Sequence, residues 1–397
     1  MTNMQITNNL GCRLTASLGS LWSARSMIVP LFLCVVALPI QADTITVTNT
    51  NDSGPGSLHQ ALADASDGDT IDFAVTGTIG LTSGELLVDK SITISGPGAD
   101  TLAINGNASS RVFHISSGKT VSISGLTITN GIASGDNGGG ILNDHATLTV
   151  NNSTISDNSV LVGAGGGIYN NGASASATLT INNSTISDNS SLVGAGIHNV
   201  ASDSSATVVI SNSSLSGNAA GLGSGGGVSN QGANASMQIN NSTLSGNSAF
   251  AGGTIRNTGN AIMELSDNIL KAGKAGGNIL NESGSTVTSH GYNLSSDDGA
   301  GLLTGPGDQI NTDPLLGPLQ DNGGPTLTHE LLPGSPAVDA GDPSFTPPPF
   351  YDQRGANFFR VRNDRVDIGS FEVQAGSLRP PPRSRPRPTP YPRPTPP

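Results

Sequence analysis

The sequence predicts an all-β fold, a parallel β-helix in which similar coils of chain stack on one another. One observation is a glycine-rich motif, GGGILN at 138–143, which recurs in related form five more times. A second is a polar motif, NNSTISDN at 151–158, which returns three more times. A third is the set of short stretches, between these motifs, in which apolar and polar residues alternate. Units that repeat in one direction at this spacing stack as the coils of a solenoid.

The alternating stretches supply the strands of each coil. In the segment 147–150, TLTV, apolar residues alternate with threonine, which is the period of a strand with one buried face. Equivalent positions of successive coils lie one strand spacing apart, about 4.8 Å, so similar residues stack. We expect one buried column at Ile141, Ile168, Ile197, Val228, Ile255 and Ile279. A second is expected at Leu148, Leu179, Val208 and Gln238, where glutamine breaks the pattern.

Asparagine closes both motifs. Those of the glycine-rich motif, at intervals of 24 to 31 residues, are Asn143, Asn170, Asn199, Asn230, Asn257 and Asn281. Those of the polar motif, which we expect to form a ladder of amide hydrogen bonds at a turn, are Asn158, Asn189, Asn218 and Asn247. Metal or sugar binding is the functional alternative, but recurrence in every coil favours stacking.

Residues 1–42 predict a signal peptide that is cleaved after Ala42. An apolar run at 27–40 follows two arginines and is too short to span a bilayer comfortably. A lipoprotein signal at Cys34 is the alternative, which the bulky residues before this cysteine disfavour. We therefore expect an exported protein, extracellular or at the cell surface, with no transmembrane helix in the mature chain.

The β-helix is expected over residues 43–290, with a short helix capping its first coil. The helix is predicted over 57–65, where Ser57 and Gln60 have the spacing of a capping box. A cap is needed because the first coil of a stack exposes unpaired strand edges. Beyond the repeats, 291–375 predicts an irregular segment rich in phenylalanine and proline, and 376–397 a disordered tail rich in proline and arginine.

Charge excludes one class of partner. From Asp43 to Gln374 the chain has 29 acidic and 10 basic residues, a balance of −19. No lysine or arginine lies between Lys119 and Arg256. Nucleic acid is excluded as a partner of this stretch because neutralising phosphates requires clustered basic residues.

Three stretches carry a resemblance to known families. The opening at 48–107, with TNTNDSGPGSLHQALADASDGDTIDF at 48–73, looks like that of large bacterial surface β-helix proteins, and the GGGI and IxxN patterns resemble repeats of polymorphic outer-membrane proteins. The run at 291–343, with DQRG at 352–355 and DIGSFE at 367–372, closely resembles the choice-of-anchor Q domain. The resemblance implies a right-handed, pectin-lyase-like β-helix that is exported and often held at a surface. It implies no known reaction, and the anchoring signals of the family are not found.

The sequence favours a structural or adhesive role at a surface, with a polysaccharide or another cell-surface component as partner. A passive envelope component is a variant of the same idea. No catalytic residue, cofactor site or metal site is identified. The alternative is a polysaccharide-active enzyme, either a pectate-lyase-like lyase or a glycoside hydrolase.

The enzyme alternative finds little support among the charged residues. A lyase needs clustered carboxylates with a basic residue, and the one candidate is Lys271 and Lys274 near Glu264 and Asp267, which solvated surface charge also explains. A hydrolase needs paired carboxylates, but the candidates, Asp297, Asp298 and Asp313, fall inside the choice-of-anchor resemblance, which accounts for them without catalysis.

Histidine and aromatic residues are also sparse. His114, His145 and His198 do not have the spacing of metal ligands. Residues 120–290 contain only two aromatic residues, Tyr169 and Phe250. Any sugar would therefore have to contact Asn, Asp and Thr side chains instead.

Overall fold

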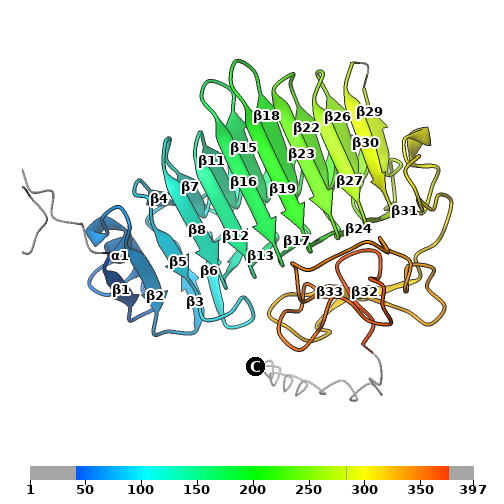
Figure 1. Ribbon diagram of the computed structural model, residues 1–397. Coiled ribbons are helices and arrows are strands. Elements are labelled where there is room, and N and C mark those ends of the chain that lie inside the picture. The colour runs from blue at the N-terminus through cyan, green and yellow to red at the C-terminus, as the bar shows by residue number, and fades with distance from the viewer. Residues whose placement is uncertain (1–41, 283, 375–397) are drawn as a thin grey trace, which may run out of the picture. The chain divides into compact units, whose positions relative to one another are not determined.

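The computed structural model describes residues 42–282 and 284–374, and it is a parallel β-helix, as predicted (Figure 1). Most coils contribute one strand to each of three parallel sheets. The predicted tail at 376–397 and the predicted signal peptide, apart from Ala42, lie outside the described residues. Within the described residues, no helix has the length and apolar character needed to cross a membrane.

Sheet A has ten strands in the order of the stack. They are β1 (Thr44–Val47), β2 (Thr70–Phe73), β5 (Thr93–Ser95), β8 (Thr120–Ser124), β12 (Thr147–Asn151), β16 (Ala177–Asn182), β19 (Ala206–Ser211), β23 (Ala235–Asn240), β27 (Ile262–Ser266) and β30 (Thr286–Gly291). Sheet B has nine strands: β3 (Gly77–Gly80), β6 (Leu102–Asn105), β9 (Thr127–Thr129), β13 (Thr154–Ser156), β17 (Thr185–Ser187), β20 (Ser214–Ser216), β24 (Thr243–Ser245), β28 (Ile269–Lys271) and β31 (Leu294–Ser295).

Sheet C has eight strands: β4 (Leu86–Val88), β7 (Phe113–Ile115), β11 (Ile141–Asp144), β15 (Ile168–Gly172), β18 (Ile197–Ala201), β22 (Val228–Gln231), β26 (Ile255–Thr258) and β29 (Ile279–Asn281). Short strands in the loops between sheets B and C pair as β10 (Ile132–Ala133) with β14 (Ser159–Val160), and β21 (Ala219–Ser224) with β25 (Ser248–Ala251). After a 3₁₀ turn (Gly299–Gly301), β32 (Leu316–Gln320) and β33 (Thr328–Leu331) form an antiparallel pair.

The first predicted column is confirmed. Its six aliphatic residues, from Ile141 to Ile279, pair in register along sheet C and are buried. The second column is wrong at its last member: Val208 pairs with Met237, which is buried, and Gln238 is exposed. A shift of one residue moves a side chain to the opposite face of a strand, so the apolar pattern is unbroken.

The predicted capping helix is α1 (Leu58–Asp64), at the first coil. The hydroxyl of Ser57 accepts a hydrogen bond from the backbone N–H of Gln60 at 3.2 Å, which satisfies one free donor at the helix start. Leu58, Ala61 and Leu62 are buried against the core.

The polar-motif asparagines Asn158, Asn189, Asn218 and Asn247 lie above one another, fully buried. Each of the first three amides donates to the side-chain oxygen of the next asparagine, at 3.0, 3.0 and 2.9 Å. The same Nδ2 atoms also donate to backbone carbonyls of strands in the preceding coil, as Asn189 does to Ile155 at 2.9 Å. Every rung therefore satisfies polar groups that the tight turn would otherwise leave unpaired.

A second ladder runs through the asparagines of the glycine-rich motif. From Asn143 to Asn281, each amide donates to the next asparagine at 2.6 to 3.0 Å. A third ladder uses serine at the turn between sheets A and B, where the backbone N–H of Ser184 donates to the hydroxyl of Ser213. From the sequence, the asparagines of the second ladder and the serines of the third were identified as repeated motif positions and not as hydrogen-bonded ladders.

The segment after residue 315 lies against the outer face of sheet B (Figure 1, yellow to red). The amide of Gln353 donates to the hydroxyl of Thr185 at 3.0 Å and accepts from Ser214 at 2.7 Å. The backbone N–H of Ser370 donates to the hydroxyl of Thr243 at 3.1 Å. Because of this cover, the outward Ser and Thr side chains of three sheet B strands are buried.

The two short motifs of this segment, DQRG and DIGSFE, pack on each other. The guanidinium of Arg354 lies between the rings of Phe358 and Phe371, at 3.9 and 3.7 Å from their centroids. It also pairs with Asp352 and donates to the backbone carbonyl of Glu372. These contacts explain why the two motifs occur together.

Glu372 is buried within this packing. Its Oε2 accepts from the backbone N–H of Asp367, while Oε1 has no partner among the described residues. Burial, with the neighbouring carboxyl of Asp367, raises the pKa of Glu372 to about 9. Burial likewise raises the pKa of Asp367 to about 6. Glu372 is therefore protonated in the folded protein at neutral pH.

Asn189→Leu tests the ladder. It removes the partner of Asn158, Asn218 and the Ile155 carbonyl, so we expect the free energy of unfolding to fall by about 1–3 kcal/mol. The matched control is Asn240→Leu, a partly exposed outward asparagine at the end of β23 whose amide has no hydrogen-bond partner among the described residues, with an expected change below about 0.5 kcal/mol. Urea denaturation measures both, and equal stability of Asn189→Leu and wild type would contradict a stabilising ladder.

Glu372→Gln tests the buried carboxyl. The folded protein holds this proton while the unfolded chain releases it above a pKa of 4.5, so wild-type stability should fall as pH rises from about 5 towards 9. Glutamine resembles the protonated acid and does not titrate. We expect similar stabilities at pH 5, and an advantage for the variant that grows by up to about 1.4 kcal/mol per pH unit. Chemical denaturation at pH 5, 7 and 9 measures both proteins. The prediction would be refuted if the stability difference between the variant and the wild type were the same at all three pH values.

Candidate functional site

The outer face of sheet A is an open surface of hydroxyl side chains. In its central strands, outward threonine and serine residues pair in register from coil to coil. They form two rows, one of Thr120, Thr147, Thr178 and Thr207, the other of Thr93, Ser122, Thr149 and Thr180. Neighbours within a row are about 4.8 Å apart, the spacing of paired strands. Sheet B carries similar rows, but there the C-terminal segment covers them.

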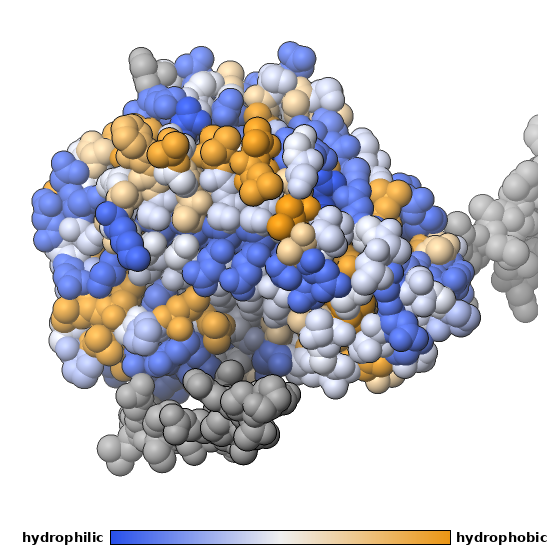
Figure 2. Space-filling view, turned by 180° about the vertical axis from the view of Figure 1, so that it is seen from behind, coloured by the Kyte–Doolittle hydropathy of each residue, from blue (hydrophilic) through white to orange (hydrophobic). Residues whose placement is uncertain are grey.

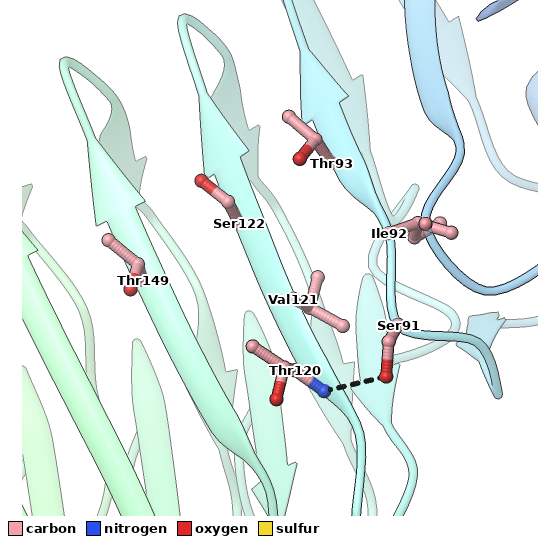
Figure 3. A pocket seen from close by; sticks show the side chains of 8 residues that line it. Ser91, Ile92, Thr93, Thr120, Val121, Ser122 and Thr149 are labelled. Carbon is pink, nitrogen blue, oxygen red and sulfur yellow. Dashed lines mark hydrogen bonds between the residues drawn. The ribbon is translucent and has the colours of Figure 1, made fainter. Parts of the chain in front are cut away.

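A shallow hollow of ≈ 360 Å³ opens among these rows (Figure 3). It forms because β5 begins at Thr93, opposite Ser122, so Thr120 extends beyond the paired part of the strand. The hydroxyl of Ser91 closes that edge by accepting from the backbone N–H of Thr120 at 3.1 Å. Among the described residues, the hydroxyls of Thr93, Ser122 and Thr149 have no protein partner, so they are available to a ligand.

Charge is nearly absent from this surface. In all ten strands of sheet A the charged side chains are Asp72 and Glu264 alone. Glu264 accepts from the amide of Gln238 at 2.7 Å and lies 3.6 Å from His290. The hollow in Figure 3 is thus lined by five serine and threonine residues with Gly68, Ile92 and Val121, and its lining includes no carboxylate and no basic group.

Ionisable groups gather instead on sheet C near the start of the stack. The guanidinium of Arg111, only 6% exposed, pairs with Glu85 and Asp136. His114 lies 3.1 Å from Glu85 and 3.9 Å from Asp144. The hydrogen bond from His114, with the charge of Arg111, lowers the pKa of Glu85.

Asp144 belongs to the coil after that of His114, so the network spans two coils. Within the second coil, Asp144 lies 2.7 Å from His145. Carboxylates that hold imidazoles are an arrangement used for proton transfer. Arg111 has a structural task as well, since its Nε donates to the backbone carbonyls of Asn137 and Gly138. From the sequence, His114 and His145 were expected to be separate residues. Glu85 and Arg111 were not identified because they lie outside the repeated motifs.

The other sequence candidates are separated. Lys271 pairs with Asp313 at 3.0 Å, whereas Glu264 lies on sheet A. Asp267 is buried and accepts from the backbone N–H of Asp342 at 2.7 Å. Asp297 accepts from the backbone N–H groups of Asn278 and Gly299 at 2.7 and 3.0 Å. Lys271, Glu264 and Asp267, which the sequence offered as one candidate lyase cluster, thus have separate partners.

Comparison with known proteins finds similarity to solved structures alone. No protein-family model and no curated protein matches this sequence. The structure is similar to Jun a 1, the major allergen of cedar pollen (15% identity, 68% of this chain and 77% of that chain, TM-score 0.42). It is also similar to pectate lyase Pel9A (14%, 85% and 98%, TM-score 0.42) and to a variant of the PL6-family alginate lyase AlyGC (14%, 67% and 40%, TM-score 0.33).

Proposed function

We propose that this is an exported β-helix protein with a structural and adhesive role, which binds an uncharged polysaccharide along the outer face of sheet A. The observation that carries the proposal is the open, uncharged surface of hydroxyl rows, with its hollow at Ser91, Thr93 and Thr120 (Figure 3). Hydroxyl groups both donate and accept hydrogen bonds, as sugars do. A row that continues over several coils can contact several units of a polymer at once, which raises avidity without strong single contacts.

Sheet B supplies an internal parallel. Its rows of serine and threonine bind the C-terminal segment through the amide of Gln353 and the hydroxyl of Ser370. Among the residues that the structure describes, none covers the rows of the same chemistry on sheet A in this way. This comparison supports recognition of a polar, uncharged partner by the open rows.

Charge favours a neutral polymer over a polyuronate. The balance of −19 between residues 43 and 374 repels a polyanion over the Debye length, about 8 Å at physiological ionic strength. The sheet A strands offer no lysine or arginine to offset this.

Export completes the proposal. The predicted signal peptide directs the chain out of the cytoplasm, and the resemblance of residues 291–375 to the choice-of-anchor Q domain supports a place outside the cell or at its surface. The described part of this segment packs on sheet B and not on the hydroxyl rows of sheet A.

The double variant Thr149→Lys with Thr180→Lys tests the binding face. It removes two hydroxyls from one row and adds long side chains, so we expect affinity for the bound polysaccharide to fall about tenfold or more. The matched control is Ser176→Lys with Ser205→Lys, the same charge change at exposed loop positions of neighbouring coils. Affinity electrophoresis in gels of neutral polysaccharides and polyuronates measures retention. The proposal would be refuted if no neutral polysaccharide retarded the wild-type protein. It would also be refuted if the two double variants were retarded equally.

A polysaccharide-active enzyme is the second candidate, favoured by the network of Glu85, His114, Asp144 and His145 on sheet C. In such an enzyme His114, held between two carboxylates, would take or give the proton at the sugar. General acid–base groups of this kind contribute roughly 10²–10⁴-fold to rate.

Incubation with neutral and acidic polysaccharides tests the second candidate. A lyase would release unsaturated products and a hydrolase new reducing ends, and His114→Asn would reduce either rate at least a hundredfold. Absence of both products would eliminate the catalytic candidate and leave the adhesive one. Robust turnover that depends on His114 would replace the adhesive role with a catalytic one.

A further inference from the structure

A second hollow, of ≈ 380 Å³, lies on the outer face of sheet C and has different chemistry. Tyr169 on β15 and His198 on β18 are register partners, and their rings stack with centroids 5.3 Å apart. Val162 and Leu192, from the loops that precede these strands, line the same hollow, as does Gln231. The hollow therefore combines an aromatic pair with an aliphatic wall and an amide.

The aliphatic wall belongs to a longer apolar ridge. The loops between sheets B and C stack from coil to coil through bridges such as Ser159 with Ser190 and Ser190 with Ala219. They expose five large apolar side chains, by 42 to 91%: Leu161, Val162, Leu192, Leu222 and Phe250. Figure 2, a view from behind, shows apolar side chains gathered in patches and not scattered singly. Apolar groups concentrated in this way mark a contact surface.

His198 is the unusual group in the hollow. It is 4% exposed, and its Nδ1 is buried without a hydrogen-bond partner among the described residues. Ser229, its register partner in the next coil, has an equally buried and unpartnered hydroxyl. Groups of this kind destabilise a fold unless something pairs with them.

Burial, with the nearby charge of Arg256, lowers the pKa of His198 to about 3, so the ring is neutral at physiological pH. A neutral imidazole carries one N–H. We assign it to Nε2, because a buried N–H without a partner is rarer than a buried acceptor without one. The edge of His198 at the hollow then presents a single donor.

We propose that this hollow binds an uncharged six-membered ring that has an apolar face and carries a hydroxyl on its edge. The apolar face of the ring would pack on Val162 and Leu192, and the edge hydroxyl would accept the hydrogen bond from Nε2 of His198. An uncharged ligand fits because the residues that line the hollow carry no charge. Two sources share this chemistry, the pyranose ring of a sugar and the ring of a phenol. The site lies on a different sheet from the proposed polysaccharide face and does not depend on it.

Titration of the full chain with a methyl pyranoside, and separately with phenol, tests the proposal. NMR of the chain carrying isotope-labelled histidine and tyrosine follows Nε2 of His198 and the ring of Tyr169, the second of which also reports binding to the His198→Phe variant. We expect one of the two probes, or both, to shift these signals saturably, which also identifies the ring. His198→Phe keeps a planar ring but removes the donor, so affinity should fall about tenfold.

Leu192→Asp, at an exposed rim position, should weaken binding by a similar factor and does not disturb the buried core. The matched control is Leu87→Asp, a half-exposed leucine of sheet C outside the hollow, which should bind as wild type does. The double variant Thr149→Lys with Thr180→Lys should also leave these signals unchanged. Failure of both probes to bind wild type, or unchanged affinity in both His198→Phe and Leu192→Asp, would overturn the proposal.

Discussion

The hydrogen bond from one asparagine amide to the asparagine of the next coil is the interaction on which this structure depends. A coil of this kind turns tightly between strands and leaves backbone groups pointing inwards, where water does not reach them. The rungs from Asn158 to Asn247, and those from Asn143 to Asn281, pair with these groups and with one another. Since each rung pairs with the next, this ladder requires the coils from Asn143 to Asn281 to repeat asparagine at the same place, whereas the coil before them has Ile115 there. That requirement also holds the strands in register and places aliphatic residues in continuous columns.

Once the interior is constrained in this way, variation is confined to the outer faces, and the three sheets differ there. Sheet A exposes uncharged hydroxyl rows, sheet B is covered by the C-terminal segment, and sheet C carries an ionic network and an apolar ridge beside Tyr169 and His198. Both proposed ligand sites lie on faces whose outward residues the ladders leave unconstrained. The outer and inner faces can differ in this way because successive side chains of a strand point alternately to the solvent and to the core.

Local pattern was sufficient for much of the fold. The columns and the helix start at Ser57 were predicted because stacking and capping impose a fixed spacing on neighbouring residues. The misplaced Gln238 shows the limit of this reasoning: loops of variable length precede each strand, so motif counting lost one residue that the buried Met237 corrects. The network of Glu85, Arg111 and His114 was missed because its members come from different coils without a shared motif.

The sequence by itself determined the repeat, the parallel stack and the lack of lysine and arginine between Lys119 and Arg256, because these follow from spacing and composition alone. Only the tertiary structure decided which faces stay open. It seated the DQRG and DIGSFE motifs on sheet B, and it brought Tyr169 and His198 together beside a ridge of loops. The physical reason is that stacking places residues about thirty positions apart one strand spacing from each other, and docking joins residues more than a hundred positions apart. The stacking separation is the period of the repeated motifs and can be read from the chain, whereas docking leaves no periodic trace in it.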